Sequence, residues 1–565
     1  MTADQPVIPP ATADLDDPLY YLCNMETVVR WVADHHSDLL TPEERAALAR
    51  FLALPVAARA LLTRMVMRTG ELFRADKLRY PELPQPEAVA LEDLLAGGWV
   101  GPVQQVTQDD LFRLFTLAEL RPAFASLLAE RGHPASLPKV RLRSVLGEAL
   151  ADTVELAHWL PGFRHSLIRL CHMPLFDRVR LMFFGNLRQS WSDFVLVELG
   201  YQQYEQVPFT PGSRAFQCRS EVDGYLLMHH CREQLDAGAA AEEVWPEVPG
   251  PTDNAWLTSR RDRLLLELGR QAERQGNRAL ALEALAQSSH REARLKQLRL
   301  LERMKRFDEA WAIARDWHSP ELSDAEAQGL ARILRRLARK VGEPAPELPV
   351  EPVPEEFVVT LPRTGVPVEL AAQQHLWQDH QPVFYVENTL VNALFGLLCW
   401  EVIFAPVPGA FFHPFHVGPA DLTREDFVPR RQALLEHSLA CLWDGGYRQV
   451  IVETCRAKQG LANPFVNWQV ISEDLLTLAL DCIPPAHLEA LFRRLLHNLK
   501  EHRSGFPDLI RFLPDEAEPA RRYEMIEVKG PGDRLQDHQR RWLAFFRQQG
   551  IAARVCYVRW REGGT

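Results

Sequence analysis

Residues 505–539 read GFPDLIRFLPDEAEPARRYEMIEVKGPGDRLQDHQ, and this stretch decides the fold of the C-terminal part of the chain. An apolar run follows Asp508, a polar turn comes next, and a second apolar run carries Glu527 and Lys529 ahead of a predicted helix. Because side chains alternate between the two faces of a strand, Glu527 and Lys529 face the same way and Val528 faces the opposite way. If the two runs pair as neighbouring strands, Asp508 lies beside Glu527, and two carboxylates share a small volume with one lysine.

This group of side chains suits the hydrolysis of phosphodiesters. Carboxylate oxygens are the ligands that Mg²⁺ and Mn²⁺ prefer, and such a cation polarises a phosphate and activates water. Lys529 can orient that water, whereas without a metal the adjacent carboxylates would repel each other and repel DNA. The pattern is the PD-(D/E)xK signature of metal-dependent nucleases. The motif alone leaves a second interpretation open, which is a strand pair carrying a surface ion pair.

The sequence from Glu527 to Leu535 (EVKGPGDRL), followed by Gln539 and Trp542, resembles the virus-type replication–repair (VRR) nuclease domain. More specifically, it resembles the Fanconi-associated nuclease family, as do residues 183–200 and 386–404. The resemblance covers nearly the whole chain after about Phe51. It implies a multidomain protein in which mainly α-helical N-terminal, SAP-like and tetratricopeptide-repeat (TPR)-like regions precede an α/β PD-(D/E)xK nuclease domain of the VRR type.

A chain of 565 residues is long for one hydrophobic core, so several domains are expected. A Pro/Glu-rich run at residues 343–354 marks the clearest boundary. We therefore predict five segments: an N-terminal helical region (1–80), a SAP-containing DNA-binding region (81–240), TPR-like helical hairpins (241–342), the Pro/Glu linker (343–356) and the nuclease domain (357–565).

Residues 107–150 resemble a SAP module, a pair of short helices that binds the backbone of duplex DNA. Lys139, Arg141 and Arg143 fall at the start of its second predicted helix, where basic side chains and free backbone N–H groups can both reach a phosphate. A preceding helix, predicted for residues 56–73, also carries arginines. For these a solvated helix face is the better supported interpretation.

Residues 256–340 predict successive helical hairpins that resemble TPRs. We expect helices over 263–274 and 278–287, and a second hairpin over 290–317 that turns near Lys305. Such repeats bind proteins or act as spacers, so repair-protein partners are expected here. The last helix carries a basic stripe, which DNA contact and the helix dipole explain equally well. Its members are Arg332, Arg335, Arg336, Arg339 and Lys340.

Residues 385–404 predict a buried helix with Glu387 at its start and Glu401 about four turns later. The family resemblance implies that Glu387, not Glu401, is an additional metal-binding glutamate. The implied ligands of Mg²⁺ or Mn²⁺ are Glu387, Asp508, Glu527 and the backbone carbonyl of Val528. The implied catalytic residues are Glu387, Asp508, Glu527, Lys529 and Gln539. Arg503, Arg534 and Arg540 join the three SAP-like residues as predicted DNA contacts.

Composition excludes several other classes of protein. The net charge of −11 does not indicate a nucleic-acid-binding protein, although a local basic patch matters more than the sum. Nine cysteines without CxxC spacing argue against a disulfide framework and a structural zinc site. Because the N-terminal segment lacks the features of a signal peptide and no stretch is apolar enough to span a membrane, we expect a cytoplasmic protein without membrane contact, associated with the nucleoid if the organism is bacterial.

The family resemblance implies a 5′-flap endonuclease with 5′-to-3′ exonuclease activity that cuts near branch points and unhooks interstrand crosslinks during DNA repair. Its expected partners are branched DNA, namely 5′ flaps and crosslinked duplexes. Two alternatives stay open: a Holliday-junction or restriction-type nuclease with the same core, and a non-catalytic repair scaffold bound to DNA.

Overall fold

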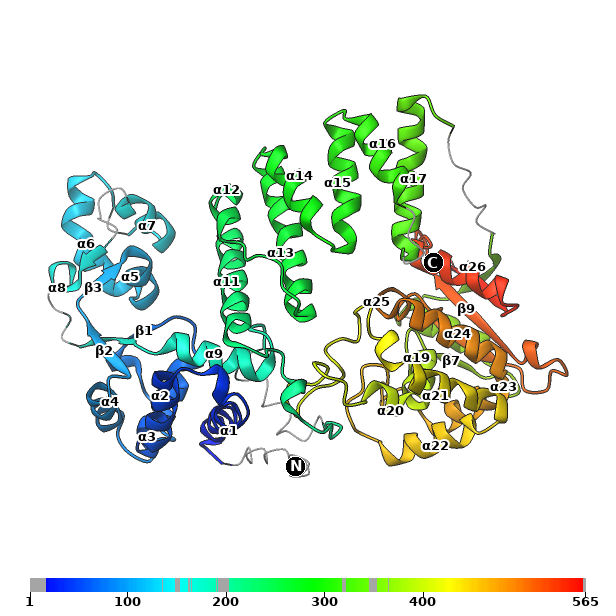
Figure 1. Ribbon diagram of the computed structural model, residues 1–565, viewed down its shortest axis with the longest axis horizontal. Coiled ribbons are helices and arrows are strands. Elements are labelled where there is room, and N and C mark those ends of the chain that lie inside the picture. Colours follow the sequence, from blue (N-terminus) through cyan, green and yellow to red (C-terminus); the bar gives the residue numbers. More distant parts are fainter. Residues whose placement is uncertain are drawn as a thin grey trace. The chain divides into compact units, whose positions relative to one another are not determined.

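The structure is a computed structural model that describes residues 17–134, 136–147, 153–160, 163, 165–189, 191, 203–317, 322–344, 353–363 and 365–561. The described residues form two compact units, which meet in the sequence at Gln202 and Gln203 (Figure 1). Three predicted segments lie wholly or partly outside the described residues: the N-terminal residues 1–16, much of the family-like stretch 183–200, and residues 345–352 of the Pro/Glu linker.

The N-terminal unit is mainly helical. Its helices are α1 (Tyr20–His35), α2 (Pro42–Ala53), α3 (Val56–Val66), α4 (Glu87–Ala96), α5 (Gln108–Leu114), α6 (Leu117–Glu130), α7 (Lys139–Gly147), α8 (Leu156–Trp159) and α9 (Met173–Phe184). Two small antiparallel sheets accompany them, one in the order β1 (Leu72–Arg74), β5 (Leu167–Leu170), β2 (Val100–Val103) and one formed by β3 (Gln105–Thr107) and β4 (Thr153–Glu155).

The helix predicted for residues 56–73 is shorter than expected. It ends at Val66, and strand β1 begins at Leu72 because Gly70 adopts a φ of 87°, which a helix interior does not accept. By contrast, α7 begins at Lys139 as expected, and Leu142 and Leu146 pack into a small core with Leu120 and Phe124. The SAP-like character of α5 to α7 stays a prediction.

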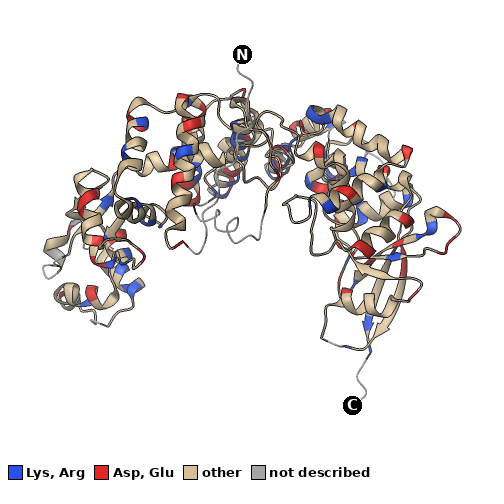
Figure 2. Cartoon of the chain, turned by 90° about the horizontal axis from the view of Figure 1, so that it is seen from below, with Lys and Arg blue, Asp and Glu red and all other residues tan. Residues whose placement is uncertain are grey.

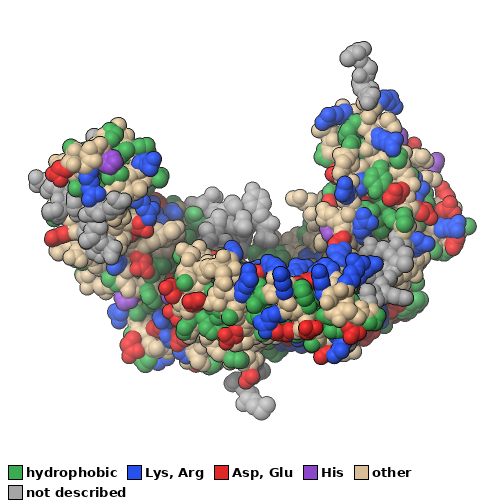
Figure 3. All heavy atoms as spheres, turned by 90° about the horizontal axis from the view of Figure 1, so that it is seen from above, with side chains coloured by type: hydrophobic (Ala, Val, Ile, Leu, Met, Phe, Trp, Pro, Cys, Tyr) green, Lys and Arg blue, Asp and Glu red, His purple; other side chains and the backbone are tan. Residues whose placement is uncertain are grey.

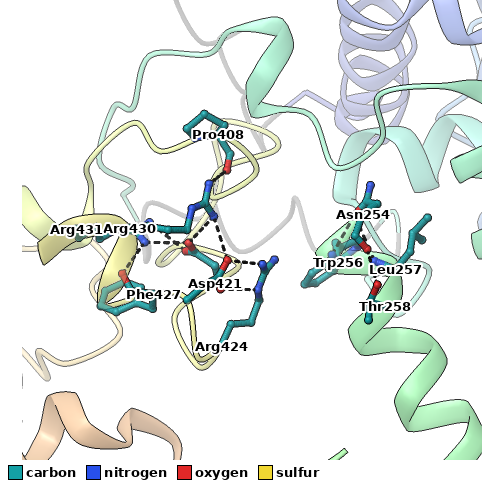
Figure 4. Close-up of polar contacts among 11 residues, drawn as sticks. Asn254, Trp256, Leu257, Thr258, Pro408, Asp421, Arg424, Phe427, Arg430 and Arg431 are labelled. Carbon is teal, nitrogen blue, oxygen red and sulfur yellow. Dashed lines mark hydrogen bonds and ion pairs between the residues drawn. The ribbon is translucent and has the colours of Figure 1, made fainter. Parts of the chain in front are cut away.

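The C-terminal unit begins with helices packed as hairpins: α11 (Arg219–Asp236), α12 (Ala241–Val244), α13 (Ala255–Arg274), α14 (Arg278–Gln287), α15 (Arg291–Arg303), α16 (Phe307–Asp316) and α17 (Asp324–Val341). The predicted hairpins are confirmed, although α13 begins eight residues before the predicted Arg263. The Asn254 side chain starts α13 by accepting the backbone N–H groups of Trp256 and Leu257 (Figure 4). The assignment of these hairpins to the TPR class stays a prediction.

The rest of this unit is an α/β fold. A five-stranded mixed sheet has the order β6 (Glu355–Leu361), β10 (Ala553–Trp560), β9 (Tyr523–Lys529), β8 (Leu509–Phe512), β7 (Val383–Tyr385). Strands β6, β10 and β9 are parallel, whereas β8 is antiparallel to both β9 and β7. Nine helices accompany the sheet: α18 (Val368–Leu376), α19 (Leu390–Leu398), α20 (Trp400–Ile403), α21 (Gln432–Asp444), α22 (Tyr447–Ala457), α23 (Glu473–Cys482), α24 (Pro485–His497), α25 (Leu499–His502) and α26 (Asp537–Gln548).

The single buried helix predicted for residues 385–404 is wrong in its boundaries. Tyr385 ends strand β7, a turn follows, and α19 begins only at Leu390, with α20 after it. Asn388 in that turn has a φ of 51°, a left-handed conformation that a continuous helix excludes. Glu387 therefore lies in the turn between β7 and α19, not on the helix.

A buried ion pair holds the loop between α20 and α21. Asp421 and Arg431 are almost fully buried, and the Asp421 carboxylate accepts two hydrogen bonds of 2.8 and 3.0 Å from the Arg431 guanidinium (Figure 4). Arg430 lies 3.0 Å from the same carboxylate. Such a paired, hydrogen-bonded carboxylate tolerates burial that an isolated one would not.

No single helix within the described ranges is long and apolar enough to cross a membrane. The pair α23 and α24, bent by 106° at their break, passes a test of length and composition together. Apolar residues of both helices, among them Leu476 and Leu491, lie in the main hydrophobic core of the unit.

Candidate active site

Asp508 and Glu527 come together because β8 and β9 pair as the sequence predicts. The register aligns Leu509 with Ile526, which places Asp508, one residue before β8, beside the end of β9. There the Val528 backbone N–H donates a hydrogen bond of 2.8 Å to Oδ2 of Asp508. On the other side, the Val386 N–H donates to the Asp508 carbonyl oxygen at 2.8 Å. Asp508 is thus held between two strand ends, by its carboxylate on one side and its backbone carbonyl on the other.

Glu527 is almost completely buried, with 1% of its surface exposed, and two groups contact it. The Lys529 Nζ atom lies 2.7 Å from its Oε1 atom, since the two side chains share a face of β9. The Gln539 side chain, from the first turn of α26, donates a hydrogen bond of 2.5 Å to the same oxygen. Three of the predicted site residues therefore form one connected group.

Glu387 lies at the exposed edge of this group. Its Oε2 atom accepts a hydrogen bond of 2.6 Å from the Tyr385 hydroxyl, and its Oε1 atom accepts one of 3.2 Å from the Asn388 amide. The Asn388 Oδ1 atom in turn accepts the Phe506 N–H at 3.1 Å. Asn388 therefore ties the turn that carries Glu387 to the loop that carries Asp508.

Tyr385 and Asn388 also contact Glu387, although the sequence motifs did not indicate them. The signal for Asn388 was present, because asparagine is one of the few residues that adopt the left-handed conformation readily. It was hidden by the apolar pattern of residues 390–404, which favoured a helix over the whole segment. The signal for Tyr385 was not local, since it depends on the pairing of β7 with β8.

The loop before Asp508 is packed against α26. Gly505 has a φ of 89°, and a Cβ atom at this position would collide with the His538 ring and lie 3.1 Å from Trp542. The Trp542 indole donates a hydrogen bond of 2.9 Å to the Ser504 carbonyl. Glycine is therefore required at position 505 so that this loop can pack closely against α26.

The carboxylates raise one another's pKa. Burial, followed by the charges of Glu387 and of other acidic groups, raises the pKa of Asp508 to about 6. Burial and the neighbouring Asp508 charge raise the pKa of Glu527 to about 8, although Lys529 opposes this shift. A site that gathers acidic groups in this way, against their repulsion, is typical of a function that uses their charge.

The donor set fits a hard divalent cation. Glu527 Oε2 is buried and has no hydrogen-bond partner among the described residues, so one carboxylate oxygen is left for another ligand. The N–H and C=O of one strand residue point to the same side, so the Val528 carbonyl points toward Asp508, as its N–H does. No three His, Cys, Asp or Glu side chains in the described part of the chain are close enough to form a complete metal site. Glu387, held by Tyr385 and Asn388, would have to approach the other two carboxylates.

The predicted DNA contacts of the nuclease domain differ in their surroundings. The Arg503 guanidinium lies over the Phe465 ring at 4.6 Å, donates to the Pro464 carbonyl and lines a pocket of about 360 Å³, and burial lowers its pKa. These contacts within the protein give Arg503 a structural role that does not depend on DNA. Arg534 and Arg540, by contrast, are exposed around the start of α26, close to Gln539 in sequence.

The three basic residues of the SAP-like region lie on α7, in the N-terminal unit. Lys139 donates to the Phe115 carbonyl at 2.9 Å, and Arg143 pairs with Asp109, whereas Arg141 is exposed. Figure 2 shows basic and acidic residues interleaved along the helices of both units. The net charge of −11 is therefore not concentrated on one surface.

Two protein-family models and several known proteins match the chain. The VRR-NUC domain model matches residues 442–560, and the FAN1 HTH domain model matches residues 19–101. A Fanconi-associated nuclease 1 homolog of Pseudomonas aeruginosa is 46% identical over 99% of this chain and 98% of its own length. The homolog of Arabidopsis thaliana is 24% identical over 95% of this chain and 67% of its own length.

Solved structures give the same result. The crystal structure of paFAN1 bound to 2nt 5′ flap DNA with gap matches with a TM-score of 0.88 and 46% identity, covering 98% of this chain and 100% of that chain. A second structure, of paFAN1 bound to 1nt 5′ flap DNA with gap, matches with a TM-score of 0.87. The fold, the paired-strand site and the extent of these matches lead to one conclusion: the chain belongs to the Fanconi-associated nuclease family, and it is a nuclease that hydrolyses phosphodiester bonds.

Proposed function

We propose that this nuclease cuts 5′-flap DNA near the branch point and degrades DNA from 5′ ends, in a role that includes the unhooking of interstrand crosslinks. The observation that carries the proposal is the hydrogen-bonded pairing of Asp508 with the end of β9, which holds two carboxylates, Lys529 and Gln539 in one corner. Support for the flap substrate comes from the related paFAN1, whose crystal structures contain 5′-flap DNA.

The proposed ligands of the cation are Glu387, Asp508, Glu527 and the Val528 carbonyl, with Mg²⁺ or Mn²⁺ as the metal. A bound cation of this kind supplies positive charge that stabilises the pentacovalent transition state of the phosphate. The carboxylates also exclude DNA from the site until their charge is balanced, so substrate binding and cation binding support each other.

The remaining residues orient these groups. Lys529 is proposed to position the attacking water and to balance negative charge on the phosphate. Gln539 fixes the Glu527 carboxylate through Oε1, which leaves Oε2 directed away from that bond. Tyr385 and Asn388 hold Glu387 at the edge of the site and are positioning residues in this proposal.

Arg534 and Arg540 are proposed to contact backbone phosphates of the substrate. Lys139, Arg141 and Arg143 are proposed to contact the phosphates of a duplex arm.

The test is cleavage of an end-labelled 5′-flap duplex with Mg²⁺, with Mn²⁺ and with EDTA, beside the variants Asp508→Ala and Glu401→Gln. We expect cutting that requires metal, that Asp508→Ala abolishes while DNA binding persists, and that Glu401→Gln leaves unchanged. If wild type binds flap DNA but cuts no flap, junction or linear duplex with either metal, the flap-nuclease proposal fails. Symmetric cutting of both strands of a four-way junction by a dimer would instead support a junction-resolving enzyme.

A further inference from the structure

One face of helix α17 bonds to the nuclease helices α24 and α26 through polar side chains. Three residues spaced four apart lie on this face, and each has one partner: Asp324 bonds to Arg494 at 2.7 Å, Gln328 to Arg541 at 3.3 Å and Arg332 to Asp537 at 3.2 Å. The C-terminal half of α17 carries exposed basic side chains, and Figure 3 shows a band of Lys and Arg over the part of the chain that carries α15 to α17. The contacts of the first half therefore tie the helical hairpins to the α/β fold.

Asp324 differs from the other two residues because its partner is buried. The Arg494 side chain is 16% exposed, whereas Arg332 and Asp537 are each 53% exposed. Among the residues that the structure describes, Asp324 is the only carboxylate in an ion pair with Arg494. Burial lowers the pKa of Arg494, and the charge of Asp324 opposes this shift. A buried cation that loses its anion is strongly disfavoured, so the guanidinium depends on Asp324 for its place.

A histidine joins the same pair. His502 is 3% exposed, and both of its ring nitrogens face oxygen atoms: Nδ1 lies 2.5 Å from the Arg494 carbonyl, and Nε2 lies 3.3 Å from the Asp324 carboxylate. The hydrogen bond with His502, together with the charges of Arg494 and Arg541, holds the pKa of Asp324 well below its usual range, although burial opposes this. Asp324 is therefore ionised at neutral pH and serves as the anion of this cluster.

The Arg494 guanidinium lies against two aromatic rings of α26. It is 5.0 Å from the centre of the Trp542 ring and 4.5 Å from the centre of the Phe545 ring. A cation over an aromatic face is attracted by the negative charge of that face, and more strongly where water is excluded. Because Trp542 is almost fully buried, the guanidinium helps to fix the position of the indole.

The same indole supports the loop that carries Asp508. Trp542 donates a hydrogen bond of 2.9 Å to the Ser504 carbonyl, and its ring packs on Phe506 with 4.1 Å between the ring centres. Phe506 lies two residues before Asp508. These contacts connect α17, through α24 and α26, to the loop that holds a proposed metal ligand.

We infer that Asp324 is a positioning residue of the nuclease, which acts by fixing Arg494 against Trp542. The indole in turn places the loop of Asp508 for metal binding. This inference rests on the proposed function, because it takes Asp508 as a ligand of the cation. It also makes the catalytic geometry dependent on the helical hairpins, since Asp324 precedes the Pro/Glu-rich linker and lies outside the α/β fold.

The test uses the full chain with Asp324→Asn, which keeps the shape of the side chain and removes its charge. The control is Asp316→Asn, the same change at the end of α16, where the side chain is 74% exposed beside Arg315. Binding of Mn²⁺ is measured without DNA, from the electron paramagnetic resonance signal of free Mn²⁺. Affinity for a 5′-flap duplex in EDTA and the single-turnover cleavage rate at saturating enzyme are measured separately, all well below the melting temperature of each variant.

We expect Asp324→Asn to bind Mn²⁺ at least about tenfold more weakly and to cut at least about tenfold more slowly, since loss of a contact that supports a metal ligand typically costs this much. Its affinity for DNA in EDTA should stay within about twofold of wild type, because the change acts on the metal site and not on the DNA-binding surface. Asp316→Asn should match wild type in all three measurements.

A second variant tests whether Asp324 acts through Arg494. Arg494→Met removes the cation and keeps an apolar side chain of similar length, so no buried guanidinium is left without an anion. In this background, Asp324→Asn should change Mn²⁺ affinity and cleavage rate by less than about twofold, whereas independent effects of the two substitutions would add in free energy.

The inference is overturned if Asp324→Asn matches Asp316→Asn in Mn²⁺ affinity and cleavage rate, whatever its melting temperature. It is also overturned if the effect of Asp324→Asn keeps its full size beside Arg494→Met. Asp508→Ala separates this inference from the proposed function. If Asp508→Ala binds Mn²⁺ as tightly as wild type, the proposed ligand set fails and the inference falls with it.

Two further outcomes distinguish the proposals. If Asp508→Ala loses Mn²⁺ affinity while Asp324→Asn keeps it, only the positioning role fails. If wild type binds Mn²⁺ through Asp508 but cuts no flap, the proposed function fails, and weaker Mn²⁺ binding by Asp324→Asn would still support the positioning role.

Discussion

The backbone N–H of Val528 donates a 2.8 Å hydrogen bond to the Asp508 carboxylate, across twenty residues of sequence. This contact joins the two halves of the PD-(D/E)xK motif. Val528 is the residue between Glu527 and Lys529. The bond therefore also fixes the register that places both of their side chains on the Asp508 side of β9. A shift of one residue in the pairing would turn both of them to the opposite face of the sheet.

Stability without metal should fall as pH rises. Carboxyl groups have pKa values near 4 in unfolded chains, and folding raises those of Asp508 to about 6 and Glu527 to about 8. The folded protein therefore binds more protons than the unfolded chain between about pH 4 and pH 8, and its free energy of unfolding decreases across that window. Thermal melting in EDTA from pH 5 to pH 9 measures this, and Mn²⁺ should restore stability most strongly at the alkaline end.

Glu527→Gln should flatten this pH dependence above pH 6, because the buried amide cannot lose a proton. Glu518→Gln is the matched control, since Glu518 is exposed beside Arg521. A melting temperature that rises with pH in EDTA would contradict the raised pKa values of Asp508 and Glu527. A Glu527→Gln protein whose melting temperature follows the wild-type pH profile would contradict the raised pKa of Glu527.

Tyr385→Phe should weaken metal binding. The hydroxyl of Tyr385 lies 2.6 Å from Glu387 Oε2, and loss of a partner that orients a metal ligand typically costs about 10- to 100-fold in affinity or activity. The Mn²⁺ concentration for half-maximal cleavage should therefore rise at least about tenfold, with the melting temperature in EDTA little changed. An unchanged metal requirement would show that Glu387 does not depend on Tyr385.

Two substitutions of Asn388 separate its conformation from its hydrogen bonds. Asn388→Gly keeps the left-handed φ of 51° but loses the contacts to Glu387 and Phe506, so it should lower activity more than stability. Asn388→Ala adds strain, and it should destabilise the protein by about 1–2 kcal/mol more than the glycine variant. Urea unfolding and flap cleavage measure the two effects. Equal stability of both variants would contradict the role of the backbone conformation.

Asp421→Ala should destabilise the nuclease domain by about 3–5 kcal/mol, because it leaves the buried Arg431 guanidinium without its anion. Asp426→Ala offers a control in the same loop. Asp426 pairs with Arg424 at a 40% exposed position, where an ion pair contributes about 0–1 kcal/mol. Urea midpoints that fall equally for both variants would argue against the buried pair as the main support of this loop.

Gly276 after α13 and Lys305 after α15 both adopt a left-handed conformation, at φ values of 88° and 60°, and an exchange of residues between these two turns tests the strain at Lys305. Lys305→Gly should stabilise the chain by about 0.5–1 kcal/mol through relief of strain, and Gly276→Lys should destabilise it by about 1 kcal/mol. Thermal or urea unfolding of the two single variants checks both signs. A loss of stability in Lys305→Gly would mean that contacts of the lysine side chain outweigh the strain of its backbone conformation.

Much of the catalytic motif could be read from the sequence. Asp508, Glu527, Lys529 and Gln539 lie in one local stretch, and the alternation of side chains along a strand is a property of the backbone alone. The strand pairing followed because a short polar turn joins the two apolar runs. The hairpins of α13 to α16 were equally accessible, since helix periodicity and the turn at Gly276 are local signals.

Other features depended on contacts between distant segments. The position of Glu387 was decided by the pairing of β7 with β8 and by Asn388. The side-chain oxygen of Asn388 accepts a hydrogen bond from the backbone N–H of Phe506, which is 118 residues away in the sequence. The apolar run of residues 390–404 indicated a helix, but periodicity could not show where the chain left β7. The basic stripe of α17 was visible in the sequence, whereas the ion pairs of Arg332 with Asp537 and of Arg336 with Glu302 were not. The sequence by itself determined which chemical groups this nuclease carries, because composition and local spacing are one-dimensional; only the tertiary structure decided which of them share a pocket, because that depends on burial and pairing between segments far apart in the chain.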